Sequence, residues 1–231
     1  GNSSKIPNED SQEFELDDNN LFSVNRFTGL DRVDSGPRVS YGVKWGLFGE
    51  GGGYTTAFLG QSYRLRKDST FAGGSGLEGN FSDIVGKVMI APNDRFSLLY
   101  RTRLDKDNLG AKRNEIKISA GVPAFRVEAN YAFFDRQEGS EYPGREELST
   151  SVTSRLNRFW RTGFSSVTDL KARDMRKIGL NLTYENECLV FSTTAQRTFF
   201  EDRDLRPSNS IFFRISFKTL GDIATKVSAS P

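Results

Sequence analysis

Residues 38–47 read RVSYGVKWGL, and apolar side chains occupy every second position of this stretch. Successive side chains of a β-strand point to opposite faces, so a period of two predicts a strand with one apolar and one wet face. The apolar face would consist of Val39, Tyr41, Val43, Trp45 and Leu47, and the other face of Arg38, Ser40, Gly42, Lys44 and Gly46.

The same alternation returns along the rest of the chain. It is clear in residues 114–122, 125–133, 177–184 and 211–217, and weaker in residues 54–63, 81–91, 96–104, 147–156, 159–170 and 188–199. Together with the first stretch, these segments predict eleven strands. Each has about ten residues, which is the length that a tilted strand needs to cross a bilayer.

The connections between the predicted strands alternate between short and long. The short ones are residues 49–53, 92–94, 123–124, 157–158 and 185–187, and the longer ones are residues 64–80, 105–113, 135–146, 171–174 and 200–208. Outer-membrane barrels have short periplasmic turns at one end of the strands and long extracellular loops at the other. The alternative, a soluble β-sandwich or barrel, does not require short and long connections to lie at opposite ends. We therefore expect an all-β fold, an antiparallel up-and-down transmembrane β-barrel.

The same pattern predicts how the chain is divided. Residues 37–220 would form the C-terminal part of the barrel, residues 221–231 a periplasmic tail, and residues 1–36 an extracellular lid or a loop that dips into the lumen. Single-chain bacterial barrels have even strand numbers, and eleven strands would leave two unpaired edges. We therefore expect a barrel that is incomplete within this sequence, with further strands and a secretion signal N-terminal to it.

Composition supports one apolar face and excludes several functions. Hydrophobic residues make up only 36% of the chain, yet 12% of residues are aromatic, which suits a sheet with a single apolar face. The net charge of +2 gives no field for nucleic acid, and no apolar run is long enough for a transmembrane helix. Without histidine and with one cysteine, the chain lacks Ser-His-Asp or Cys-His catalysis, the site of a phospholipase barrel, and His or multi-Cys metal sites. We expect neither an enzyme nor a cofactor.

Three stretches carry a resemblance to a known family. Residues 21–32 read LFSVNRFTGLDR, residues 184–188 read YENEC, and residues 210–221 read SIFFRISFKTLG. They resemble, respectively, a loop motif, a late cysteine-bearing turn and the final strand of the LptD family, the lipopolysaccharide-assembly or organic-solvent-tolerance proteins of the outer membrane. The resemblance spans the chain, and its first motif is the most specific.

The resemblance implies transport across the outer membrane of a Gram-negative bacterium. Lipopolysaccharide would arrive from a periplasmic bridge protein, a lipoprotein would plug the lumen, and the lipid would leave sideways between the first and last strands. The lid motif would be Arg26, Gly29, Asp31 and Arg32, and the gate strand would carry Ile211, Phe213, Ile215, Ser216 and Phe217. The sequence departs from the family in lacking its periplasmic domain and first barrel half.

Cys188 lies in a predicted periplasmic turn and is the only cysteine. Some members of the family have two adjacent cysteines in this turn, whereas Glu187 precedes Cys188 here. An unpaired cysteine in an oxidising compartment predicts a disulfide to an upstream cysteine, and the alternative is a small buried apolar residue.

The charged residues have two interpretations each. Arg26, Asp31 and Arg32 could contact lipid phosphates, or they could form structural ion pairs in a loop. An acidic run in residues 9–18 could hold divalent cations, but a solvated surface segment is the simpler interpretation. Seven cations on the wet strand faces could guide an anionic glycolipid, or simply make a polar lumen: Arg38, Lys44, Lys117, Arg126, Lys177, Arg214 and Lys218.

Two further features complete the prediction. Trp45, Trp160 and Tyr184 at strand ends fit an interfacial aromatic girdle, or are ordinary anchors of a sheet. Residues 49–53 are glycine-rich but lack the Lys and Ser/Thr of a phosphate loop and precede a strand, so we expect a turn.

Three functions remain open at this point. A lipopolysaccharide translocon accounts for the motifs, a general porin or receptor barrel accounts for the strands alone, and a soluble binding module would fold in water without detergent. The translocon would have lipopolysaccharide, the plug lipoprotein, the bridge protein and the outer membrane as partners, and no nucleic acid.

Overall fold

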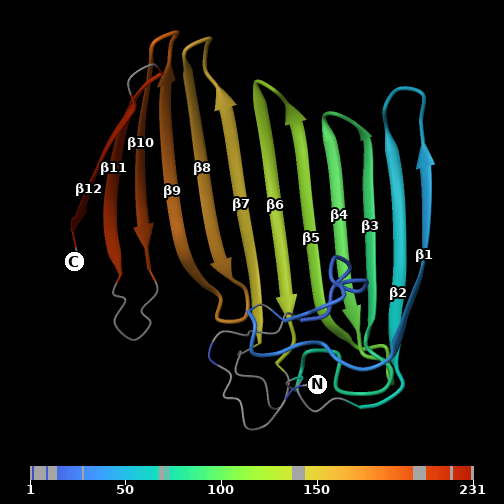
Figure 1. Cartoon of the computed structure of the whole chain (residues 1–231). Coiled ribbons are helices and arrows are strands. Elements are labelled where there is room, and N and C mark those ends of the chain that lie inside the picture. Colours follow the sequence, from blue (N-terminus) through green and yellow to red (C-terminus); the bar gives the residue numbers. More distant parts are fainter. Residues whose placement is uncertain are drawn as a thin grey trace. The chain divides into compact units, whose positions relative to one another are not determined.

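The computed structural model describes residues 2, 9, 15–27, 29–67, 71, 73–136, 144–199, 207–218 and 221–229. Among these residues, twelve strands follow one another in a single antiparallel meander in which each strand lies beside its neighbours in sequence (Figure 1). This confirms the predicted all-β, up-and-down topology. The strands are β1 (Arg38–Phe48), β2 (Tyr54–Arg64), β3 (Ile84–Asn93), β4 (Phe96–Leu104), β5 (Ala111–Val122), β6 (Phe125–Phe134), β7 (Arg145–Arg155), β8 (Trp160–Asp169), β9 (Asp174–Glu185), β10 (Leu189–Thr198), β11 (Ser208–Phe217) and β12 (Gly221–Ala229).

The twelfth strand corrects two expectations. Residues 221–231 were expected to be a tail, but β12 pairs antiparallel with β11 from Phe217↔Gly221 to Asn209↔Ala229. β11 is therefore not the last strand, and the structure has one strand more than the expected eleven. The sheet is not closed among the described residues, which agrees with the expected incomplete barrel. In the described part of the chain, β1 pairs only with β2 and β12 only with β11.

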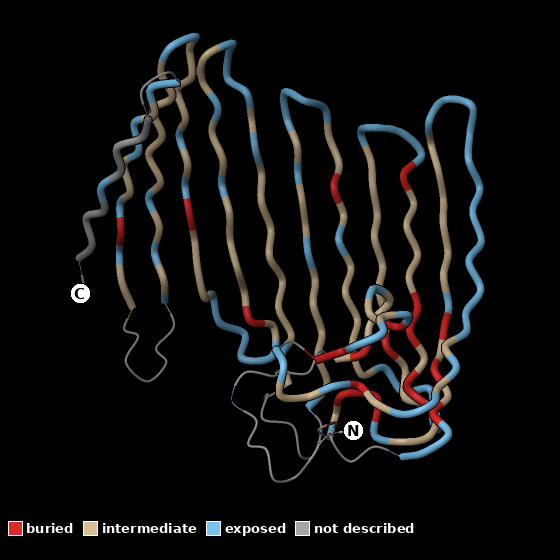
Figure 2. Tube along the Cα trace, viewed as in Figure 1, coloured by how far each residue is buried: buried red, intermediate tan, exposed pale blue. Residues whose placement is uncertain are grey.

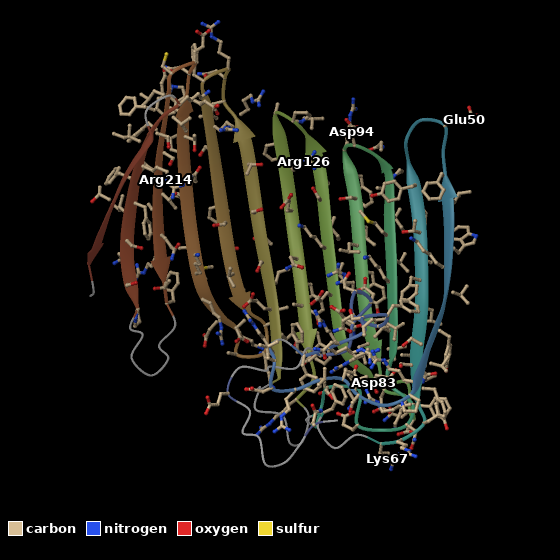
Figure 3. The ribbon with its side chains drawn as sticks, in the orientation of Figure 1. Glu50, Lys67, Asp83, Asp94, Arg126 and Arg214 are labelled. Carbon is tan, nitrogen blue, oxygen red and sulfur yellow. The ribbon has the colours of Figure 1, made fainter. Side chains whose placement is uncertain are left out.

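The chain divides into two compact units. The first consists of Gly1–Asp94, Leu98–Ile116 and Ala132–Arg145, and the second of Arg95–Ser97, Lys117–Tyr131 and Glu146–Pro231. Within the first unit, Figure 3 places Glu50 and Asp94 in the short turns at one end of the strands, and Lys67 and Asp83 in the long connection at the opposite end. The glycine-rich residues 49–53 form a hairpin turn, closed by the hydrogen bond from Gly49 N to Gly53 O at 2.7 Å.

The strands have one apolar face that is open to its surroundings. In the first unit Val43 pairs with Leu59, and in the second unit Leu180 lies between Phe164 and Ala195. Val43 is 74% exposed and Leu180 58% exposed. A sheet of a soluble protein would bury these apolar side chains, whereas here they are exposed. The described residues contain no helix that is long and apolar enough to cross a membrane.

The buried core of the first unit lies on the other face. Figure 2 shows buried residues gathered where the N-terminal chain and the β2–β3 connection meet the ends of β2 and β3. Leu21 and Val85 are completely buried there, and Phe27 stacks on Phe71 with ring centroids 4.9 Å apart. The cluster comprises Leu16, Leu21, Phe27, Phe71, Leu77 and Val85, with Phe58 packed against it.

Candidate transport surface

The polar face is the strand face opposite the apolar one, and in the first unit it carries the N-terminal segment, residues 15–36 without the undescribed residue 28. Ser40 Oγ donates to Leu21 O at 3.0 Å, and Arg38 Nη2 donates to the carbonyls of Ser23 and Val24 at 2.6 and 2.7 Å. At Gly60 a Cβ atom would lie 2.4 Å from Leu21 Cδ2, so the absence of a side chain lets the segment approach β2 closely. The segment therefore lies against the polar face.

Asp34 fixes this segment by pairing with three arginines. Its carboxylate lies 3.0 Å from Arg26 Nη1, 2.7 Å from Arg38 Nη1 and 2.8 Å from Arg64 Nη2. The Asp34 and Arg26 side chains are fully buried. Since Arg26 belongs to the segment, Arg38 to β1 and Arg64 to β2, the carboxylate joins all three elements. We call these four residues the Asp34 hub.

Of the four lid-motif residues, only Arg26 belongs to the Asp34 hub. Arg26 also donates to the carbonyls of Asn20 and Leu21, at 3.1 and 2.6 Å, so its guanidinium is engaged inside the fold. Burial lowers the pKa of Arg26, and Asp34 opposes that shift. Gly29 has φ +76°, Arg32 is half-buried, and Asp31 Oδ2 accepts a hydrogen bond from the Glu9 backbone N–H. The structural ion pair is the interpretation that fits Arg26.

A second set of charges lies farther along the same face, on β3 to β5. Asp18 Oδ2 lies 2.9 Å from Lys87 Nζ, and Asp18 Oδ1 lies 3.3 Å from Arg101 Nε. Glu15 Oε2 lies 3.8 Å from Arg103 Nη2 and 3.9 Å from Arg113 Nη1. We call Lys87, Arg101, Arg103 and Arg113 the basic stripe.

The acidic run is thus only partly a solvated segment. The Asp18 side chain is 4% exposed and Glu15 37% exposed, and both face the basic stripe. Asp17 instead accepts backbone hydrogen bonds from Asn19 and Asn20. Asp10 and Glu13 lie outside the described residues.

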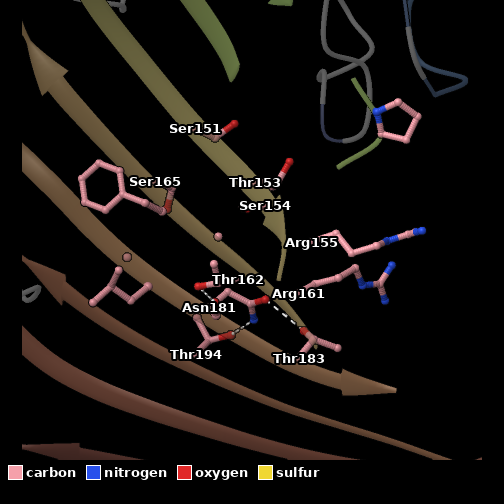
Figure 4. A pocket seen from close by; sticks show the side chains of 15 residues that line it. Ser151, Thr153, Ser154, Arg155, Arg161, Thr162, Ser165, Asn181, Thr183 and Thr194 are labelled. Carbon is pink, nitrogen blue, oxygen red and sulfur yellow. Dashed lines mark hydrogen bonds between the residues drawn. The ribbon is translucent and has the colours of Figure 1, made fainter. Parts of the chain in front are cut away.

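The polar face of the second unit has different chemistry. A hollow of about 510 Å³ is lined mostly by hydroxyl and amide side chains of β7 to β10 (Figure 4). At its centre Asn181 Nδ2 donates to Thr194 Oγ1 at 2.9 Å, and Thr183 Oγ1 donates to Asn181 Oδ1 at 3.0 Å. Ser151, Thr153 and Ser165 also line it.

The seven cations predicted to face the lumen do not form one site. Arg38 belongs to the hub, Arg126 Nη1 donates to Ser119 Oγ at 3.0 Å, and Arg214 lines a second hollow with Ser192 and Ser216. Figure 3 labels Arg126 and Arg214 on their separate strands of the second unit. Lys44 and Lys117 are exposed, Lys177 is half-buried, and Lys218 Nζ donates to Glu185 Oε1 at 3.0 Å.

The gate-strand residues divide between the two faces of β11. Ile211, Phe213, Ile215 and Phe217 pair with Ala195, Thr193, Phe191 and Leu189 of β10, and Ser216 lines the polar hollow. Ser216 also pairs with Asp222 of β12. The strand expected to close the barrel is therefore flanked on both sides.

Cys188 lies in the β9–β10 turn and is exposed with a free thiol. Its backbone N–H and that of Leu189 donate to Asn186 Oδ1, at 3.0 and 2.7 Å, which fixes the turn. The exposed side chain does not fit the buried-residue alternative. Near this turn, Tyr184 packs against Trp160 with ring centroids 5.1 Å apart, as an aromatic girdle would.

Sequence reasoning missed Asp34, Arg64 and the basic stripe. Asp34 lies four residues before the first residue of β1 and Arg64 is the last residue of β2, so both carried a signal as charged residues near strand ends. The stripe was missed because β3 and β4 alternate only weakly, which left no basis for assigning Lys87 or Arg101 to a face.

An antiparallel meander that exposes its apolar face and makes its ion pairs on the polar face belongs to the class of outer-membrane β-barrel proteins. Comparison with protein families gives the particular group. The pattern of the family LptD, described as LPS transport system D, matches residues 1–160. The chain belongs to the LptD family, outer-membrane components of lipopolysaccharide transport and assembly in Gram-negative bacteria. No curated protein matches closely enough to be reported as a relative.

Proposed function

We propose that the chain forms part of the translocon that inserts lipopolysaccharide into the outer leaflet. The observation that supports this most is the separation of the two faces. The apolar face, with Val43 and Leu180 exposed, suits contact with acyl chains, and the polar face suits passage of a sugar head group. A general porin needs the same faces, but the LptD family match favours lipid transport.

The exit would be sideways, because a molecule with a polar head and acyl tails must reach two environments at once. Unpaired backbone groups are costly in hydrocarbon, so the free edges of β1 and β12 need partner strands. We propose that β12 forms the closing seam, with β11 supporting it. A seam without a tight turn is the easiest to part.

Three further roles belong to this proposal. The long connections would lie outside the cell, residues 1–36 would enter the lumen from that side, and the turn that carries Cys188 would lie in the periplasm. Cys188 would form a disulfide with a cysteine of the same protein upstream of this sequence. A plug lipoprotein would occupy the lumen, and a periplasmic bridge protein would deliver the lipid.

The test is photocrosslinking of lipopolysaccharide in living cells. A photoreactive amino acid would replace Ser216 on the polar face of β11 or, as the control, Ile215 on its apolar face. Crosslinks at Ser216 should vanish when periplasmic supply is blocked, while crosslinks at Ile215 persist because lipid already in the outer leaflet surrounds it. If lipopolysaccharide reaches the cell surface only when it is supplied from the periplasm, yet never crosslinks at Ser216, passage along the polar face is contradicted.

A further inference from the structure

The basic stripe is held differently from the Asp34 hub. All three ion pairs of the Asp34 carboxylate span 3.0 Å or less. Of the four contacts that Glu15 and Asp18 make with the stripe, only the one between Asp18 and Lys87 is that short, and the other three span 3.3 to 3.9 Å. Arg101 Nε is buried and makes no hydrogen bond among the described residues. The two acidic residues thus cover the stripe and leave the Arg101 Nε donor without a hydrogen bond in the described part of the chain.

Carboxylates outside the N-terminal segment neutralise the four cations of the stripe only in part. The carboxylates beside the stripe that do not belong to the N-terminal segment are Asp83, 3.6 Å from Arg103 Nε, and Glu115, which accepts from Arg113 Nη2 at 2.6 Å and lies 3.9 Å from Arg101 Nη1. The four cations are therefore paired with only two of these carboxylates. The other two negative charges are those of Glu15 and Asp18 in the N-terminal segment. If these two moved away, the stripe would carry two uncompensated positive charges on the polar face.

The chemistry of the stripe selects the ligand. Three of its four members are arginines, whose planar forks bind oxyanions through two donors at once, and the fourth is a lysine. A phosphate group offers more acceptor oxygens than a carboxylate, so it suits several guanidinium groups better. The polar face is also where a phosphorylated sugar would pass under the proposed function.

We propose that Lys87, Arg101 and Arg113 bind the phosphate groups of the lipopolysaccharide head group, and that Glu15 and Asp18 occupy this site when no lipid is there. Arg103 is buried, and its Nη1 donates to Ser75 O at 2.8 Å, so it supports the site from inside the fold. This inference rests on the proposed function. The acidic residues act as a stand-in for the phosphates, and the Asp34 hub keeps the segment attached while they leave. The site is therefore covered between transport events without a permanent charge on the lumen wall.

The test measures binding of a fluorescent diphosphorylated lipid A disaccharide to the purified full-length protein in detergent, with the dephosphorylated disaccharide as the second ligand. Glu15→Gln with Asp18→Asn removes the competitor and should tighten binding of the phosphorylated lipid about two- to tenfold, as expected for two weak ion pairs. Arg101→Gln with Arg113→Gln should weaken it by at least as much. The dephosphorylated lipid should respond to neither change.

Lys44→Gln with Lys117→Gln is the matched control, because it removes two exposed positive charges outside the stripe. It should leave binding unchanged. Heat-modifiable mobility on gels would show that each variant is folded, and Asp18→Asn alone would carry the test if the double variant does not fold.

The outcomes separate the two proposals. If the wild-type protein binds the phosphorylated lipid but the stripe and segment variants do not change its affinity, the stripe is structural and this inference is wrong. If the wild-type protein binds neither lipid, the proposed function fails as well. Equal loss of binding in the Lys44 and Lys117 control would reduce the effect to bulk charge and would also overturn the inference.

Discussion

The polar faces of the two units use different chemistry on the same kind of sheet. In the first unit, ion pairs and a small hydrophobic core hold the N-terminal segment against the strands. In the second unit, a hollow is lined by hydroxyl and amide side chains that bond one another across β9 and β10. The polar face of the first unit is therefore covered by protein, whereas that of the second unit is open to water.

The largest expected effect is the loss of the buried Asp34 carboxylate, compared with the loss of the exposed Glu185 carboxylate. Asp34→Asn would leave three mostly buried arginines without their counter-ion, which should cost about 3–5 kcal/mol in docking of the N-terminal segment. Hydrogen exchange at Leu16, whose N–H donates to Ser75 O, would report that loss. Glu185→Gln is the control, because Glu185 also bridges two cations but is solvent-exposed, and its loss should change little. Equal protection of the Leu16 N–H in both variants would contradict the conclusion that the Asp34 hub holds the N-terminal segment in place.

The apolar faces should not differ between the units. Val43→Arg in the first and Leu180→Arg in the second should each destabilise the barrel in a bilayer by about 2–4 kcal/mol, because a charge enters hydrocarbon at mid-strand. Ser151→Arg, on the wet hollow, should cost much less. Refolding titrations of the full-length protein into vesicles would measure all three. An equal cost at Ser151 would show that the second polar face is packed rather than wet.

Glycines on the two polar faces should respond differently to a methyl group. Gly60→Ala would place a Cβ 2.4 Å from Leu21 Cδ2 and should loosen the segment by about 1–3 kcal/mol through overpacking. Gly163→Ala meets nothing closer than 3.7 Å and should be neutral or slightly stabilising. Limited proteolysis within the N-terminal segment would detect the first effect. Unchanged cleavage in Gly60→Ala would mean that Leu21 is not held against β2.

The smallest effect is a pH dependence at the long-loop end of the first unit. Burial raises the pKa of Asp83, with Arg103 opposing the shift. Its contribution to stability is therefore complete below the ordinary carboxyl pKa and is lost as pH rises through the raised pKa. Asp105 is the opposite case, because backbone N–H groups of Asp107 and Asn108 lower its pKa and its contribution is lost as pH falls.

Hydrogen exchange of Ser82, whose N–H donates to Ser62 O, should then become slightly faster from acid to neutral pH, beyond the intrinsic change. Asp83→Asn should remove that excess. Asp105→Asn should leave it in place. A protection that is independent of pH in the wild-type protein would show that Asp83 keeps an ordinary pKa in the fold.

Sequence periodicity predicted the strands well because each face of a membrane strand faces one solvent over its whole length. It missed β12 because the sequence of this strand, GDIATKVSA, has few large apolar residues and therefore no clear alternation. It could not find the Asp34 hub, because Arg26, Arg38 and Arg64 are 8, 4 and 30 residues away from Asp34 in the sequence. The register of β1 with β2 brings Arg38 beside Arg64, and the packing of the N-terminal segment brings Arg26 to them. Pairings of this kind depend on tertiary structure.

The proposal that the polar face lines a lumen and the apolar face meets lipid is tested most directly along β9. A fluorophore would be attached in turn to positions 178 to 183 of the full-length protein in vesicles, with nitroxide-labelled lipids as quenchers. We expect quenching at Ile178, Leu180 and Leu182 and little at Gly179, Asn181 and Thr183, with a period of two. Quenching without alternation, or strongest at Asn181, would contradict a strand that crosses the membrane in this orientation.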